Sequence, residues 1–184
     1  GPPDAPTQVA AAAGDARVAL TWSAPASTGG YSITGYRVEY STAASPTTWT
    51  VAVADTGTNS TAYTVTGLTN GEQYRFRVRS ITPAGSSIAS DVVAGAPRRV
   101  PDPVTGLSAT PSGDGIVSVS WTAPVNAGGS ALIGYRVSVS ANGGADWVDA
   151  TANTGSTATE YRVTGLAAGT SHIFAVRALN AAGE

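Results

Sequence analysis

Apolar side chains alternate with polar or small ones along most of the chain. The segment "RVALTW" shows the pattern, because one small or polar residue separates Val18 from Leu20 and Leu20 from Trp22. Two further segments repeat it with Tyr36, Val38 and Tyr40, and with Tyr74, Phe76 and Val78. Alternation with a period of two residues predicts strands that bury one face and expose the other.

Short turn sequences separate the alternating segments. Gly-Gly occurs at Gly29 and at Gly128, Thr-Gly ends at Gly57 and at Gly155, and Asn-Gly begins at Asn70. Such pairs favour tight turns between strands, because glycine adopts backbone angles that other residues avoid. No helical period competes with this pattern. Roughly six or seven short strands per hundred residues predict an all-β sandwich.

The chain contains nearly the same text twice. "VALTWSAPASTGGYSITGYRVEYS" in the first half matches "VSVSWTAPVNAGGSALIGYRVSVS" in the second, which aligns Trp22 with Trp121 and Tyr36 with Tyr135. Further along, "YTVTGLTNGEQYRFRVRS" matches "YRVTGLAAGTSHIFAVRA". Two copies about a hundred residues apart indicate two whole domains in tandem, because the units of a solenoid are shorter.

Composition excludes several kinds of chemistry. There is no cysteine, and all ten basic residues are arginine, so the chain holds no disulfide, thiolate metal site, thiol nucleophile or catalytic lysine. The net charge of −2 supplies no global basic field, and nucleic-acid binding is therefore not expected. No apolar run reaches the roughly 20 residues that a membrane helix needs, so membrane insertion is not expected.

Each copy resembles a fibronectin type III domain of the bacterial type. The matching features are Trp22 on the expected second strand, "GYRV" on the third, "TGL" before the sixth and "YRFRV" on the sixth. The resemblance implies two tandem immunoglobulin-like β-sandwiches that are extracellular or at the cell surface. It also implies a tyrosine corner, in which a hydroxyl on the sixth strand bonds back to the preceding loop. Tyr74 fits that position, and His172 takes it in the second copy.

The alternation and the resemblance together predict the structural core. Its expected members are Trp22, Tyr36, Leu68, Tyr74, Trp121, Tyr135, Leu166 and His172. His172 is the chain's single histidine and belongs to no Ser/His/Asp motif, so we expect packing rather than acid–base work from it. The carboxylates are scattered and form no D-x-D-x-D-G calcium loop. No catalytic residue, metal ligand or cofactor is therefore expected.

Prolines mark a junction between the copies. Three of them restrict the segment "APRRVPDPV" and disfavour helix there, which predicts a short and stiff connection. We expect a first domain at 1–97, a Pro-rich linker at 98–103 and a second domain at 104–184.

The second copy ends at Glu184, without an equivalent of the "SSIASDVVAGAP" segment that supplies the seventh strand of the first copy. A sandwich that lacks this strand exposes an unpaired sheet edge. Three explanations stay open: further chain in the native protein, a strand supplied by another molecule, or an exchange between two chains. The last two would allow self-assembly through the open edge of the second domain.

The arginines of the first copy form the main candidate binding site. If Tyr74, Phe76 and Val78 point inward, Arg75, Arg77 and Arg79 point outward. The resemblance places the third strand beside the sixth, which adds Arg37 to the same face, with Glu39 and Trp49 nearby. Such a face either keeps the domain soluble, with Arg77 stacked on Trp49, or binds an anion or polysaccharide through planar guanidinium groups.

These observations predict a non-catalytic spacer or adhesion module of a larger surface or secreted protein, one that is not an enzyme and that contacts protein or polysaccharide. Two alternatives remain open. The chain is an accessory module of a secreted polysaccharide-degrading enzyme, or it is a surface-filament subunit completed by strand exchange. The resemblance alone does not separate them, because one fold serves many functions.

Overall fold

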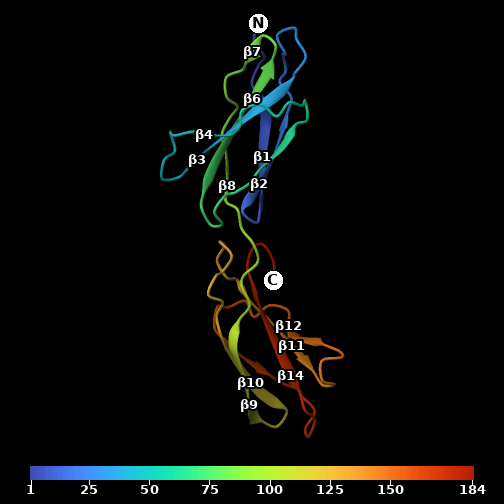
Figure 1. Ribbon diagram of the computed structural model, residues 1–184. Helices are drawn as coiled ribbons and strands as arrows, with labels where there is room; N and C mark the ends of the chain where they lie inside the picture. The colour runs from blue at the N-terminus through green and yellow to red at the C-terminus, as the bar shows by residue number, and fades with distance from the viewer. The chain divides into compact units, whose positions relative to one another are not determined.

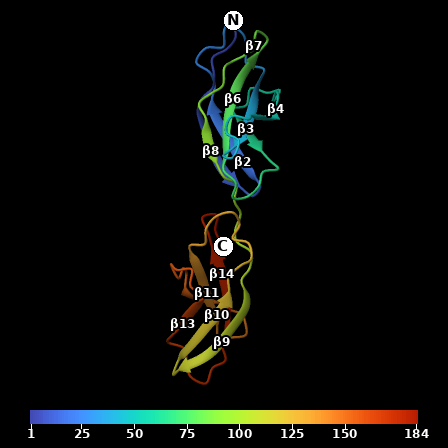
Figure 2. The same ribbon diagram turned by 90° about the vertical axis from the view of Figure 1, so that its left-hand side faces the viewer.

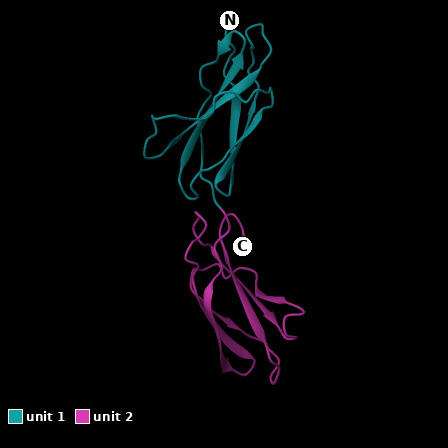
Figure 3. Cartoon of the chain, viewed as in Figure 1, with its two compact units in different colours: residues 1–98 teal, residues 99–184 magenta.

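Strands joined by turns and loops form the chain. The computed structural model describes residues 1–184 and contains fourteen strands, β1 to β14, and no helix. The chain divides into two compact units, Gly1–Arg98 and Arg99–Glu184 (Figure 3). Each copy of the repeat therefore folds as one unit, and the all-β class predicted from the alternation is confirmed.

Unit 1 is a sandwich of two antiparallel sheets (Figure 1, Figure 2). The first sheet has the order β1 (Thr7–Gly14), β2 (Arg17–Ser23), β5 (Ala62–Val65). The second has the order β4 (Thr50–Val53), β3 (Gly35–Thr42), β6 (Tyr74–Thr82), β7 (Gly85–Ser86), and β8 (Val93–Gly95) also pairs with β6. Strands β7 and β8 thus close the outer edge of β6.

Unit 2 repeats this plan with one difference. Its first sheet has the order β13 (Glu160–Val163), β10 (Ile116–Thr122), β9 (Thr105–Gly113). Its second has the order β12 (Val148–Thr151), β11 (Gly134–Ser140), β14 (Ile173–Leu179). Strand β14 pairs with β11 along one edge, and no strand of the chain pairs with the other. The second sheet of unit 2 therefore lacks a last strand beside β14, as the sequence predicts.

Each unit has its own buried cluster, built from the inward faces of its two sheets. Trp22 lies edge-on against Tyr36 with ring centroids 5.0 Å apart, and Trp121 lies against Tyr135 in the same way at 4.9 Å. Of the other expected core residues, Leu68 and Tyr74 are buried in unit 1, and Leu166 packs, partly buried, against the cluster of unit 2. The aromatic pair bridges the sheets at the same place in both units.

Packing explains why the repeated "GYRV" begins with glycine in both copies. Tyr36 and Val38 are buried, and Gly35 lies against the side chain of Asp55, whose Oδ1 accepts a hydrogen bond from Gly57 N at 2.8 Å. A Cβ at Gly35 would lie 1.7 Å from that oxygen. In unit 2 the amide oxygen of Asn153 crowds Gly134 in the same way. Glycine at the start of the phrase therefore makes room for the cap of the neighbouring turn.

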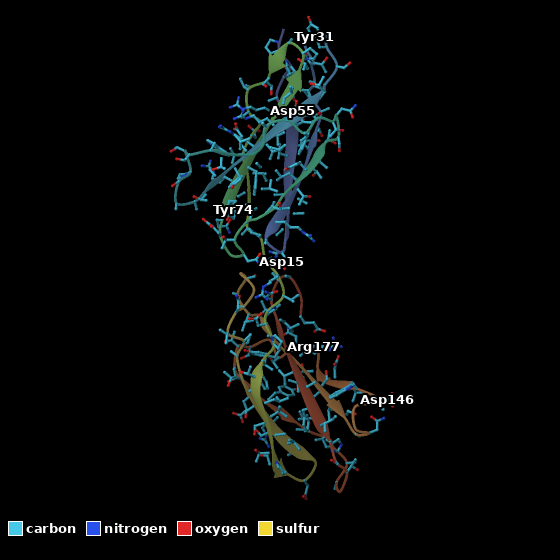
Figure 4. All side chains as sticks on the ribbon, viewed as in Figure 1. Asp15, Tyr31, Asp55, Tyr74, Asp146 and Arg177 are labelled. Atoms are coloured by element: carbon cyan, nitrogen blue, oxygen red, sulfur yellow. The ribbon has the colours of Figure 1, made fainter.

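The tyrosine corner forms in unit 1 only. The Tyr74 hydroxyl, at the start of β6 (Figure 4), accepts a hydrogen bond from Thr69 N at 2.9 Å and donates one to Glu72 Oε2 at 3.0 Å. His172 is half-buried, and its ring makes no hydrogen bond that would replace the corner of unit 1. His172 directly precedes β14, and its place in the core of unit 2 stays a prediction.

Replacing His172 by tyrosine should restore the missing corner. The new hydroxyl would accept a hydrogen bond from the loop NH of Ala167, and we expect unit 2 to gain about 0.5–1 kcal/mol of unfolding free energy. The matched change Tyr74→Phe should cost unit 1 about 1 kcal/mol. Thermal unfolding of both variants checks this; an unchanged or lowered stability of H172Y would show that the corner does not transfer.

The segment expected to be a linker is divided between the units. Arg98 N donates to Gly14 O inside unit 1 at 2.9 Å, and Arg99 N donates to Gly128 O inside unit 2 at 2.9 Å. The unit boundary falls between these two arginines. The Pro-rich residues that follow belong to unit 2, where Asp102 N bonds to Asn126 O at 2.9 Å.

Candidate functional site

The four arginines singled out from the sequence lie together on the outer face of β3 and β6 in unit 1. The register of the two strands places Arg37 opposite Arg79 and Glu39 opposite Arg77. All four guanidinium-bearing residues are partly exposed. We call this surface, made by Arg37, Arg75, Arg77, Arg79 and Trp49, the arginine face.

Glu39 organises the arginine face from beneath. It is only 4% exposed, although it lies on the outer side of the sheet. Its carboxylate accepts hydrogen bonds from Arg37 Nε at 2.8 Å and from Arg77 Nε at 2.5 Å, and Arg79 Nε lies 3.8 Å away. The arginine side chains cover it, so that one carboxylate holds three guanidinium groups in place.

The same contacts keep Glu39 ionised. Burial raises the pKa of the Glu39 carboxyl, but the hydrogen bonds from Arg77 and Arg37 and the charges of Arg77 and Arg79 outweigh burial and lower this pKa below its usual value. Glu39 is therefore a charged part of the fold at neutral pH.

Trp49 is covered by its arginine neighbours. The guanidinium carbon of Arg77 lies 4.0 Å from the centroid of the indole ring, and that of Arg75 lies 6.0 Å away. The stacking of Arg77 on Trp49 that the sequence predicts is therefore present. One indole face is taken by a cation, which leaves it less able to serve as a platform for a sugar ring.

The other guanidinium hydrogen bonds on this face go to backbone oxygens. Arg75 Nη1 donates to Pro46 O at 3.3 Å, and Arg79 Nη1 donates to Ser87 O at 3.2 Å. Four guanidinium groups face a single carboxylate, so the surface is positively charged. It offers carboxylate or sulfate groups charge-assisted hydrogen bonds from the donors that remain free.

Unit 2 carries a second charged cluster that the sequence alone did not reveal. Arg136 binds Asp149 with two parallel hydrogen bonds of 2.9 Å, and its Nη1 reaches Glu184 Oε1 at 2.7 Å. Arg177, labelled in Figure 4, also approaches Glu184, at 3.3 Å. The hydrogen bond from Arg136 is the largest influence on the Asp149 carboxyl and lowers its pKa. Desolvation raises this pKa, but the bond from Ser138 and the charges of Arg136 and Arg177 add to the lowering, and the net shift is downward.

The sequence did not predict this second cluster, because its carboxylate lies on a different strand from the carboxylate of unit 1. The central acid of unit 1 lies on β3, as Glu39, whereas unit 2 has Ser138 at that point of β11 and places Asp149 opposite it on β12. One sequence feature could have indicated the cluster. Asp149 stands two residues after Trp147, whereas the first copy has the apolar Val51 two residues after Trp49.

No three His, Asp or Glu side chains lie close enough together to share a metal ion. His172 and Asp114 both line a hollow of about 290 Å³, and no hydrogen bond or ion pair joins the two side chains. The charged groups of the two clusters are paired with one another on the outer faces of the sheets.

The sequence matches one family twice. The fibronectin type III domain family matches residues 4–95 and 102–184. Chitinase A1 of Niallia circulans is 37% identical over 175 residues, which is 91% of this chain and 22% of that protein. Human myomesin-2 is 31% identical over 170 residues, 89% of this chain and 11% of that protein. The chain therefore spans only a small part of the relatives that it matches.

A solved structure agrees with the fold. The FN1–FN3 domains of chicken CNTN1 superimpose with a TM-score of 0.54 over 100% of this chain and 64% of that one, at 20% identity. At this identity the likeness concerns the fold.

Proposed function

Because the chain belongs to the fibronectin type III family as two tandem domains, we propose that it is a non-catalytic spacer and adhesion module of a larger extracellular or cell-surface protein. The relatives support this role, because the matched region is 22% of chitinase A1 and 11% of myomesin-2. In both, the pair of domains is a minor part of a longer chain. None of the chain's segments is a helix of the length and apolarity required to cross a bilayer.

The junction between the units carries the spacing part of the proposal. Gly71 N bonds to Pro97 O and Arg98 N bonds to Gly14 O within unit 1, each at 2.9 Å. On the other side, Asn180 Nδ2 donates to Arg99 O at 2.8 Å within unit 2. No unbonded run of residues separates the two anchored ends, and we infer a short connection with little freedom of its own.

Lengthening the junction should therefore loosen the module. The chain contains no cysteine, so single cysteines at the exposed positions Ser60 and Thr157 accept spin labels without background. We expect one narrow distance distribution in the parent chain. Inserting Gly-Ser-Gly-Ser between Arg98 and Arg99 should broaden it clearly, because such linkers behave as flexible coils. An equally broad distribution in both proteins would contradict the spacing role.

The arginine face is the proposed adhesive surface, and anionic polymers are its best-matched partners. Its positive charge and free guanidinium donors favour sulfated or carboxylated polysaccharides and acidic protein segments. We expect retention on a sulfated polysaccharide column that falls with salt and falls again in an Arg37→Ala, Arg75→Ala double variant. Arg17→Ala, Arg162→Ala is the matched control, because it removes the same charge from the opposite sheets. Equal losses in the two variants would show nonspecific attraction only.

A second candidate is supported by one comparison. The 37% identity with chitinase A1 over 91% of the chain favours an accessory module of a secreted polysaccharide-degrading enzyme. The test is sedimentation of the chain with insoluble chitin at physiological salt. Binding that Trp49→Ala or Trp147→Ala weakens would support this candidate, whereas a chain that stays in solution would contradict direct contact with the polymer.

A further inference from the structure

Trp147 in unit 2 exposes an indole face at the point where unit 1 stacks an arginine. In unit 1, Arg77 is paired with Glu39 across the sheet and covers Trp49 at 4.0 Å. In unit 2 the residue paired with Ser138 at the same place is Ala175. A methyl group replaces a guanidinium there, and Trp147 is left 44% exposed.

A hollow of about 340 Å³ lies where the missing arginine would be. We call it the Trp147 hollow; it is lined by Arg136, Ser138, Trp147, Asp149, Ala175 and Arg177. Its volume accommodates one flat side-chain group. Unit 1 and unit 2 thus share a framework, with the central cation present in one and absent in the other.

The walls of the Trp147 hollow are held in place before any ligand arrives. The Trp147 indole NH donates to Gly144 O at 3.1 Å, which sets the orientation of the ring. Arg136 grips Asp149 with two bonds of 2.9 Å, and Ser138 Oγ donates to Asp149 Oδ1 at 3.1 Å. A site whose groups are already ordered loses less entropy when it binds.

The net charge around the Trp147 hollow is less positive than the net charge of the arginine face, so the hollow repels a cation less. Arg136 and Arg177 are balanced by the carboxylates of Asp149 and Glu184, to which they are bonded. In unit 1, Arg77 stacks on Trp49 even though three further arginines and only one carboxylate surround it. The arrangement in unit 2 therefore imposes less repulsion on an incoming positive group.

We propose that the Trp147 hollow binds the guanidinium group of an arginine side chain presented by a partner protein, in the position that Arg77 occupies over Trp49. The planar cation would stack on the indole and lie within reach of Asp149, the interaction that unit 1 makes within its own sheet. This site is separate from the spacing role and does not depend on it.

The direct test uses a small probe and the indole NH signals of the four tryptophans. Nα-acetyl-arginine amide is titrated into the ¹⁵N-labelled chain, with the Trp147 signal assigned by Trp147→Phe. We expect a saturable shift of that signal in the millimolar range, since one cation–π contact and one ion pair are weak. Nα-acetyl-lysine amide should bind about two- to fivefold more weakly, and the Trp49 signal should stay still.

Matched variants decide what fills the hollow. Ala175→Arg supplies the arginine within the chain and should abolish the shift of the Trp147 signal. Asp149→Asn keeps the tryptophan and should weaken binding several-fold. The proposal is overturned if acetyl-arginine amide produces no saturable shift, if A175R responds like the parent chain, or if N-acetylglucosamine oligomers shift the Trp147 signal and the arginine probe does not.

Discussion

Replacing Trp22 by alanine is expected to lower the unfolding free energy of unit 1 by about 3–5 kcal/mol. Trp22 is 5% exposed and lies edge-on against Tyr36, 5.0 Å between ring centroids, so its removal opens a cavity between the two sheets. The loss combines the transfer free energy of the ring with the cost of a space that the sheets cannot close. Chemical denaturation followed by NMR signals from each unit measures it.

The matched variant is Trp121→Ala, which should produce the same loss in unit 2 only. The two buried clusters share no residue, so each variant should leave the other unit's transition in place. If W22A shifted the unfolding of both units equally, the two would form one cooperative domain, and the division into separate modules would be wrong.

Replacing Glu39 by glutamine should cost unit 1 about 2–3 kcal/mol. Breaking a buried ion pair by removing one partner is expensive, but the three arginines are partly exposed and water relieves part of the cost. Glutamine preserves the shape and one acceptor, so a loss of this size would report the charge rather than packing. Denaturation at pH 7 measures the effect, with Glu160→Gln in unit 2 as an exposed control.

The same residue predicts a pH dependence. The folded pKa of Glu39 lies below its unfolded value, so the folded state binds fewer protons than the unfolded state between the two. The stabilisation is fully present above the unfolded pKa and is lost as pH falls through the folded pKa. Unit 1 should weaken in acid, and E39Q should remove that part of the slope. A parallel pH profile in the variant would contradict the role of Glu39.

The fold was predictable because its signals are local and occur twice. Alternation around Val18, Leu20 and Trp22 shows which residues face inward, and the repeat shows where a second core begins. His172 marks the limit of this argument, because alternation gives the direction of a side chain but not whether the end of a strand is covered. Burial there depends on what the rest of the sheet supplies.

The charged faces were harder to predict, because they depend on pairing between distant strands. The sequence places Arg37 and Arg77 on one side of the sheet, but it does not indicate that Glu39 lies beneath them and is nearly inaccessible to solvent. In the second copy, Asp149 meets Arg136 only through the register of β12 against β11. Register is a property of the folded sheet and cannot be read from either strand alone.

The rotational correlation times of the two units, from ¹⁵N relaxation on the intact chain, test the spacing role most directly. A short junction anchored at Arg98 and Arg99 predicts that both units tumble with one common correlation time, close to that of a single particle of 184 residues. Two separate and shorter correlation times, each typical of one unit alone, would show that the units move independently. That result would contradict the proposal that this tandem pair holds other domains at a set distance.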